Sequence, residues 1–305
     1  MNHPLSTTNE VIGLLPAGGQ ATRISPLPCS KELYPIGFRT VGNPPTTRPK
    51  VVCHYLLEKM QLAGISKGYV IVRPGKWDIP AYLGDGSLVG MNLGYLTQGL
   101  PYGAPFTLDQ AYPFVKHARV AIGFPDILFQ PDDAFSRLLA RQSATEADVV
   151  VGVLPFENPR KGGMVDFDEA GRVRSIIEKP EQSDSCYSWC IAVWTPAFTE
   201  FMHEYLETRL LQQLGGDRTL LEQVRQEGHQ TKALPKFEIP MGDVIHAAIA
   251  HDLRVEAEIL PGPGYLDIGT PNDLMRAVRD YAQPAPEQSA TPVLPQTSSI
   301  PSSSN

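Results

Sequence analysis

Short apolar runs recur along the first half of the chain and alternate with a segment of helical periodicity. Five of these runs have the length and β-branched content of buried strands: residues 11–15, 68–72, 93–97, 119–124 and 148–154. A helix is predicted over residues 51–63, and Gly64 follows as its C-terminal cap. The apolar face of this helix carries Val52, Leu56 and Met60. The alternation predicts an α/β fold, with a Rossmann-like, mixed but mostly parallel sheet flanked by helices.

The second half of the chain carries a hairpin pattern and two helix starts. Residues 164–168 and 173–178 surround a Glu-Ala-Gly-Arg turn, which predicts a small antiparallel addition to the sheet. Residues 195–196 and 270–271 are both Thr-Pro, which places an N-cap residue before a proline. We therefore expect a helix to begin at each of these two sites.

Two adjacent acids, Asp132 and Asp133, precede an amphipathic segment that contains Phe135, Leu138 and Leu139. An acidic pair can bind a metal ion, but aspartate is also a preferred N-cap residue. Because the pair stands where a helix should start, we expect one of the two to cap that helix.

Composition and charge exclude several classes of protein. The hydrophobic share of 42% and the charged share of 19% are typical of a globular protein. A net charge of −7 disfavours nucleic acid as a partner, and no apolar run approaches the ~20 residues of a membrane span. The first residues lack the pattern of a secretion signal, so a cytoplasmic location is expected.

The ends of the chain differ in composition from the middle. Residues 1–9 are polar and are expected to be flexible, and residues 283–305, rich in Pro, Ser, Thr and Gln, are expected to be disordered. The predicted domain is therefore a single compound unit over residues 10–282.

A glycine-rich loop follows the first predicted strand. It fits neither the Walker A spacing nor the G-x-G-x-x-G dinucleotide pattern. What remains is a turn in which Gly18 and Gly19 let backbone N–H groups approach an anion, with Arg23 and Lys31 within reach of it. The alternative is a plain turn between strand and helix that carries a surface arginine.

The segment 12–37 resembles the G-G-x-G-T-R…P-K signature of the sugar-1-phosphate nucleotidyltransferases, especially the glucose-1-phosphate thymidylyltransferase group. The resemblance continues in order along the chain through segments 48–65, 82–99, 176–180 and 264–277, which include an E-K-P and an L-D-I-G-T motif. It implies transfer of a nucleotidyl group from an NTP, with dTTP or UTP as first guesses, to a sugar 1-phosphate. It is also compatible with a homo-oligomer.

The resemblance also implies a role for individual residues in nucleotide binding. The phosphates would be held by the cations Arg23 and Lys31. Backbone and base contacts would come from five positions in the loop or after the third predicted strand: Gly18, Gly19, Ala21, Gln98 and Gly103. A surface glutamine is the alternative for Gln98.

The same resemblance implies a sugar-phosphate pocket and a metal site. Lys179 would bind the phosphate, and Glu178 would accept hydrogen bonds from sugar hydroxyls, in an antiparallel pocket that includes Gly163 and Trp189. Mg²⁺ would be bound by two separated aspartates, Asp126 and Asp267. A turn-capping role is the alternative for Asp126.

Several positions depart from the family pattern. Ala21 replaces a glycine, and the spacing from Arg23 to Lys31 is two residues shorter than usual. Asp126 follows an inserted Phe-Pro pair, and residues 189–191 (Trp-Cys-Ile) stand where the family has Thr-Gly below the sugar. A different sugar, or a non-sugar phosphate such as phosphocholine, is therefore kept open.

Two further classes compete with the enzyme prediction. One is a non-catalytic, nucleotide-sensing member of the same fold, which should have lost catalytic cations or metal ligands. The other is a glycosyltransferase, which should carry a D-x-D at a strand end.

Overall fold

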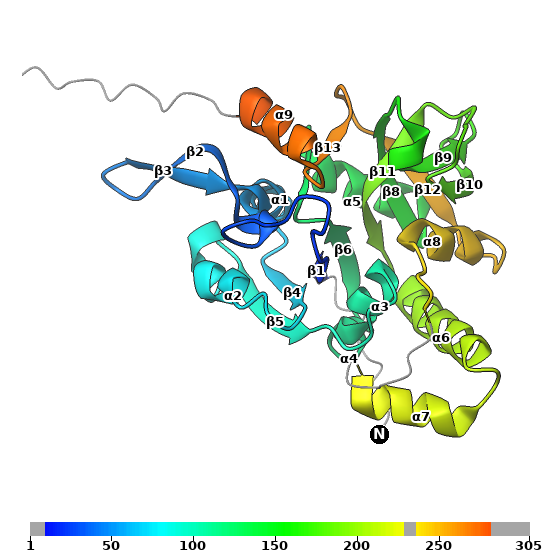
Figure 1. The fold of residues 1–305 in the computed structure, drawn as a ribbon. Coiled ribbons are helices and arrows are strands. Elements are labelled where there is room, and N and C mark those ends of the chain that lie inside the picture. Colours follow the sequence, from blue (N-terminus) through cyan, green and yellow to red (C-terminus); the bar gives the residue numbers. More distant parts are fainter. Residues whose placement is uncertain (1–9, 229–235, 282–305) are drawn as a thin grey trace, which may run out of the picture.

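The computed structural model describes residues 10–228 and 236–281, and a nine-stranded sheet forms its centre (Figure 1). The strands are β1 (Val11–Ala17), β4 (Lys67–Val72), β5 (Asn92–Thr97), β6 (Arg119–Gly123), β8 (Val149–Pro155), β9 (Gly163–Phe167), β10 (Val173–Glu178), β11 (Tyr187–Trp194) and β12 (Val255–Ile259). They lie in the order β10-β9-β11-β6-β1-β4-β5, and β8 pairs with both β11 and β12. The predicted termini, 1–9 and 283–305, lie outside the described residues.

Strand direction divides the sheet. The strands β6, β1, β4 and β5 are parallel, as are β8 and β12, whereas β11 runs antiparallel to β6, β8 and β9. The predicted hairpin is present as β9 and β10, and it extends the main sheet as an antiparallel addition. The mixed Rossmann-like fold expected from the sequence is confirmed.

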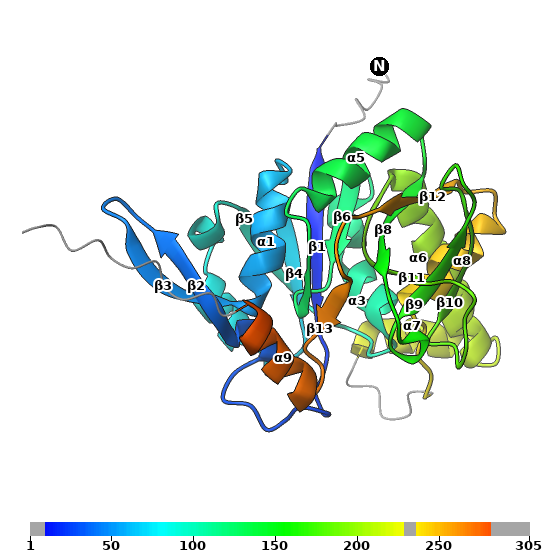
Figure 2. The ribbon, with the colours of Figure 1, turned by 90° about the horizontal axis from the view of Figure 1, so that it is seen from above.

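Helices cover both faces of the sheet (Figure 2). They are α1 (Val52–Leu62), α2 (Asp78–Leu83), α3 (Ala104–Leu108), α4 (Tyr112–Val115), α5 (Ala134–Thr145), α6 (Pro196–Gln213), α7 (Arg218–Glu227), α8 (Met241–Ile249) and α9 (Pro271–Tyr281). One core cluster receives Leu56 of α1 and Phe135 of α5, and another receives Phe198 of α6 and Val244 of α8. Within the described residues, no helix has the length and apolarity needed to cross a membrane.

Two small antiparallel ribbons were not expected from the sequence. One pairs β2 (Pro35–Val41) with β3 (Thr46–Val51), and it projects from the body of the molecule (Figure 2). The other pairs β7 (Ile127–Phe129) with β13 (Tyr265–Asp267). Both strands of this second ribbon have three residues, which is too short for a periodic pattern. Short 3-10 helices complete the described chain: η1 (Lys31–Leu33), η2 (Ser87–Val89), η3 (Asp109–Ala111) and η4 (Pro159–Lys161).

The helices predicted from Thr-Pro pairs begin where expected, but only one threonine caps its helix. The Oγ1 of Thr270 accepts a hydrogen bond from the backbone N–H of Asp273 at 3.2 Å, as an N-cap should. The Oγ1 of Thr195 instead donates to Asp148 Oδ1 at 3.2 Å, and this residue makes no side-chain cap.

The capping role predicted for Asp132 or Asp133 is wrong. Asp133 occupies the N-cap position of α5, but its carboxylate accepts from Arg137 Nε at 3.0 Å and makes no cap. Asp132 pairs with the buried Lys59 ammonium. Ion pairing with nearby cations has therefore replaced capping at this helix start.

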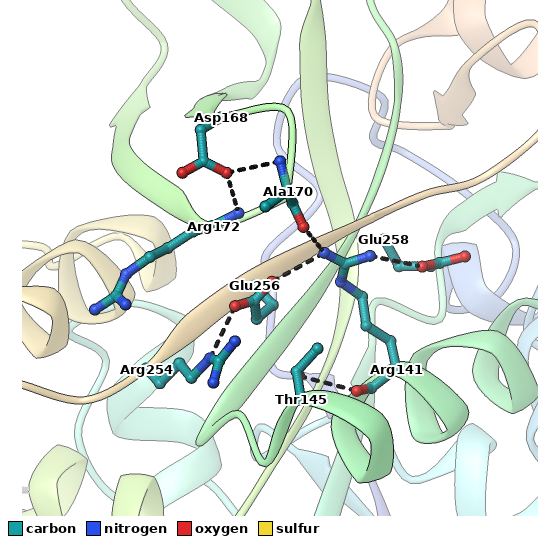
Figure 3. A network of polar contacts seen from close by, with 8 residues as sticks. All are labelled: Arg141, Thr145, Asp168, Ala170, Arg172, Arg254, Glu256 and Glu258. Atoms are coloured by element: carbon teal, nitrogen blue, oxygen red, sulfur yellow. Dashed lines mark hydrogen bonds and ion pairs between the residues drawn. The ribbon is translucent and has the colours of Figure 1, made fainter.

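A network of polar contacts fastens the hairpin to the rest of the sheet (Figure 3). Glu256 of β12 is 2% exposed and accepts hydrogen bonds from Arg141 Nη2 and Arg254 Nε, both at 2.9 Å. Arg141 of α5 also donates to the carbonyl of Ala170 in the turn between β9 and β10. The network thus holds the hairpin whose far end carries Glu178 and Lys179.

Candidate active site

The carboxyl ends of three parallel strands align at one edge of the sheet. Ala17 of β1 is in register with Val72 of β4, and Val72 is in register with Thr97 of β5. The residues that follow are Gly18, Arg73 and Gln98, and all three line a cleft of about 650 Å³. This edge is where open α/β sheets bind their ligands.

The glycine-rich loop keeps its turn although a glycine is replaced. Ala21 has a φ of 54°, in the left-handed region, and its carbonyl accepts from Ile24 N and Ser25 N at 3.1 and 3.0 Å. A left-handed residue with a Cβ costs roughly 1–2 kcal/mol. The two local hydrogen bonds stabilise the conformation that glycine would adopt freely, so the shape of the turn survives the substitution.

Gln98 and Gly103 line the same cleft as the loop. Gln98 Nε2 donates to Thr107 Oγ1 at 2.7 Å, and a Cβ at Gly18 would come within 3.0 Å of the Gln98 amide. Gly103 has a φ of 102°, and a Cβ there would lie 2.3 Å from the carbonyl of Ile239. Gln98 therefore faces the loop and is not a surface residue, and Gly103 is required for the wall to close.

The ribbon of β7 and β13 brings the two predicted metal ligands together. Asp267 is in register with Ile127, and the N–H of Ile268 donates to the Asp126 carbonyl at 3.1 Å. Lys31 Nζ pairs with Asp126 Oδ2, and Arg23 Nη2 lies 3.9 Å from Asp267 Oδ2. Residues from three distant parts of the sequence therefore meet at one point.

Burial and charge set the protonation behaviour of this cluster. Burial, followed by repulsion from Asp126, raises the pKa of Asp267 above its ordinary value, against the opposing effect of Lys31 and Arg23. Burial would lower the pKa of Lys31, but the carboxylates of Asp126, Asp267 and Glu32 together raise it. Lys31 therefore stays charged. The positive charges of Lys31 and Arg23 do not fully offset the effect of burial and of Asp126 on the pKa of Asp267.

The two aspartates fit a magnesium ion. The Oδ1 of Asp267 is buried and has no hydrogen-bond partner among the residues described, although the side chain as a whole is 43% exposed. No group of three acidic, His or Cys side chains that could form a complete metal cage occurs within those residues. Mg²⁺ is commonly bound by one or two carboxylates, with water and substrate phosphates as its other ligands. An open site with two carboxylates is suited to that ion.

A second pocket of about 360 Å³ adjoins the first and shares Asp126 with it. It brings together the predicted sugar-phosphate residues, namely Gly163, Glu178, Lys179 and Trp189. Glu178 Oε1 accepts from Trp189 Nε1 at 3.2 Å and from Gly242 N at 3.1 Å. Burial raises the pKa of Glu178 despite these hydrogen bonds. A Cβ at Gly163 would lie 2.4 Å from Trp189 Nε1, so the pocket requires glycine there.

The expectation that residues 189–191 all line this pocket is wrong. The pairing of β11 with β8 shifts register between Trp189 and Ile191, which marks a β-bulge. Because of the bulge, Cys190 and Ile191 both enter the same core cluster, and only Trp189 lines the pocket. The departure from the family pattern thus changes the pocket through one side chain.

Sequence reasoning missed several residues that line these pockets, among them the charged residues Arg73, Lys161 and Glu238. Lys161 Nζ lies 3.1 Å from Asp273 Oδ2, at the rim beside Lys179. Glu238 lines both pockets. Arg73 was detectable because it directly follows a predicted strand, whereas Lys161 and Glu238 belong to no motif.

Comparisons with known proteins identify the family of the chain. Residues 12–284 match the family model described as Nucleotidyl transferase. A glucose-1-phosphate thymidylyltransferase from Neisseria meningitidis is 29% identical over 182 residues, which are 59% of this chain and 58% of that protein. One from Actinoplanes is 29% identical over 274 residues, which are 89% of this chain and 78% of that protein. The chain thus spans little more than half the length of the Neisseria relative.

Other similar proteins differ in the nucleotide and sugar they are named for. A mannose-1-phosphate guanylyltransferase from Mycobacterium tuberculosis is 29% identical over 57% of this chain and 45% of its own. A crystal structure from Bacillus anthracis, provisionally named a glucose-1-phosphate thymidylyltransferase, superposes with a TM-score of 0.68 over 89% of this chain and 95% of its own. Its sequence is only 17% identical, so the likeness concerns the fold.

Proposed function

The chain belongs to the nucleotidyl transferase family, and from this premise we propose that it joins a sugar 1-phosphate to an NTP and releases pyrophosphate. The observation that carries the proposal is the position of Asp126, which lines both pockets, and of Asp267, which lines the second, beside Lys31 and Arg23. Two polyanions can meet at such a point only where cations neutralise them.

In the proposed reaction, an oxygen of the sugar phosphate attacks the α-phosphorus of the NTP. The bond from that phosphorus to the β-phosphate oxygen breaks, and pyrophosphate leaves with the electron pair. The attacking oxygen is already ionised near neutral pH, so no general base is required. Mg²⁺, bound by Asp126 and Asp267, would supply charge neutralisation at the phosphates.

Protein residues would bind and orient the two substrates. Gly18, Gly19 and the left-handed turn at Ala21 would present backbone N–H groups to the nucleotide. Arg23 would hold the triphosphate, and Lys31 would neutralise charge near the α-phosphate. Gln98 and Gly103 would contact the base, for which thymine or uracil is proposed first.

The second pocket would take the sugar phosphate. Lys179 would bind its phosphate, while Glu178, oriented by Trp189, would accept hydrogen bonds from hydroxyl groups. Gly163 leaves the room in which these side chains meet.

A panel of NTPs and sugar 1-phosphates, assayed for pyrophosphate with Mg²⁺, tests the proposal. We expect turnover with at least one pair, and the active pair identifies the base and the sugar. Phosphocholine belongs in the panel because the pocket differs from the family pattern at Trp189. Tight NTP binding with no turnover for any pair would instead favour the nucleotide-sensing alternative.

A further inference from the structure

Arg73 occupies the middle of the binding edge but belongs to none of the family motifs. It follows β4 directly, and β4 lies between β1 and β5 in the sheet. The register described above places Arg73 between Gly18 and Gln98, one residue beyond the last paired position of each strand. It lines the same cleft as both of these residues.

The side chain of Arg73 has no hydrogen-bond or ion-pair partner in the part of the chain that the structure describes. Across residues 10–228 and 236–281 it makes no hydrogen bond or ion pair, and its Nε is shielded from solvent. A polar group that is buried without a partner is costly, and such a group in a cleft is explained by a ligand, ion or water that satisfies it. The unpaired guanidinium therefore favours a ligand that accepts hydrogen bonds.

Of the three acids that line this cleft, Glu32 and Asp126 are already paired with other cations, and the third, Glu238, makes no ion pair with Arg73 among the described residues. Glu32 accepts from Lys76 Nζ at 2.7 and 2.9 Å, and Asp126 pairs with Lys31. The positive charge of Arg73 is consequently left for whatever enters the cleft. In a bound nucleotide only the phosphates are anionic, and a guanidinium matches phosphate oxygens in a bidentate manner.

We propose that Arg73 is a phosphate-binding residue for the nucleotide, in addition to Arg23 and Lys31. This inference rests on the proposed function, since it takes the cleft to be the NTP site. Arg23 lies near Asp267 and lines a different pocket from Arg73. Arg73 would then add a cation to the part of the cleft that Arg23 does not line.

Direct binding of two probes to the full chain tests this role without turnover. The probes are the best-bound NTP and inorganic tripolyphosphate, each titrated by calorimetry with Mg²⁺. We expect Arg73→Met to weaken both by about 10- to 100-fold, the range of a lost charge-assisted hydrogen bond. Arg73→Lys should recover part of the loss. Arg137→Met, which removes an exposed arginine paired with Asp133, should change neither affinity and serves as the control.

Two results would overturn the inference. One is an unchanged affinity of Arg73→Met for both probes. The other is a loss for the NTP with none for tripolyphosphate, because Arg73 would then contact base or ribose. Melting curves of each variant separate a lost contact from a lost fold, and Arg73→Lys is the variant to read if Arg73→Met unfolds. If the wild-type chain binds no NTP, the proposed function itself fails, and this is distinguishable from both results.

Discussion

At the two pockets, hydrogen bonds from neighbouring residues fix the orientation of individual side chains and occupy some of their polar atoms. Glu178 is the clearest example, because Trp189 and the backbone of Gly242 both donate to its Oε1. The other oxygen is left to accept from a substrate. The same burial that orients the carboxylate also makes its ionised form costly.

The unfavourable ionisation of the buried Glu178 carboxyl group predicts a pH-dependent effect on the stability of the protein. The pKa of Glu178 is raised in the folded protein, so the carboxyl group does not reduce folding stability below the ordinary glutamate pKa of 4.5. Folding stability is then lost as the pH rises through the raised pKa. We expect Glu178→Gln to match wild type near pH 4.5 and to melt up to about 3 °C higher at pH 8. Its KM for the sugar phosphate should rise about tenfold.

The control for this prediction is Glu181→Gln, at an exposed position, which should show neither effect. Melting temperatures at the two pH values and steady-state kinetics provide the measurements. A Glu178→Gln variant less stable than wild type at pH 8 would show that burial is not what governs this carboxylate.

The β-bulge in strand β11 separates a residue that packs in the core from a residue that lines the pocket. The bulge directs Ile191 into the core, where the side chain is fully buried, while Trp189 reaches the pocket. Two residues of one strand, two positions apart, therefore have different roles.

This division can be tested with two conservative substitutions. Trp189→Phe removes the donor to Glu178 and should raise the KM for the sugar phosphate about fivefold to tenfold, with the KM for NTP unchanged. Ile191→Val should lower the free energy of unfolding by about 0.5–1.5 kcal/mol and leave both KM values unchanged. A sugar-phosphate effect from Ile191→Val would place that residue back in the pocket.

The polar network on β12 is a second element with a testable role (Figure 3). Glu256→Ala leaves two arginines without their buried acceptor and should lower the free energy of unfolding by about 3 kcal/mol in urea. Glu258 lies 3.6 Å from Arg141 and is 20% exposed, so Glu258→Ala should cost less than about 1 kcal/mol. Equal effects would show that the network does not fasten the hairpin.

The sequence pattern predicted those strands and helices whose position depends on the residues within the element itself. The run 11–15 and the helix from residue 52 were recognisable because their apolar spacing decides their burial. The pairing of β7 with β13 was not, since it joins segments more than a hundred residues apart through three-residue strands. The bulge at Trp189 likewise depends on contacts with β8, which no local pattern encodes.

The candidate site was recovered through motifs rather than through periodicity. Asp126 and Asp267 were named from the resemblance alone, and their closeness follows from a ribbon that the sequence did not reveal. Arg73 shows the opposite case. It lies outside every motif, yet the rule that ligands bind at the carboxyl ends of parallel strands leads directly to it.

At the scale of the whole molecule, two pockets meet over the carboxyl edge of one sheet, with the shared Asp126 between them. The loop after β1 and the ends of β4 and β5 line one pocket, while the hairpin and β11 line the other. This is the layout that transfer between two phosphorylated substrates requires.

The C-terminal segment bears on where the functional unit ends. Residues from Pro284 onward contain little that could be buried, so we expect their deletion to leave kcat/KM within about twofold and stability unchanged. Kinetics and thermal melting of the shortened chain provide the test. Loss of activity would move the domain boundary beyond residue 282.

Nucleotidyl transfer at the Asp126–Asp267 site is tested most directly by following the two ends of one labelled NTP. With the active substrate pair, label at the α-phosphate should appear in the nucleotide sugar and label at the γ-phosphate in pyrophosphate. Asp267→Asn should melt near the wild-type temperature and form neither product. Free nucleoside diphosphate as the product, or full turnover by Asp267→Asn, would contradict the account.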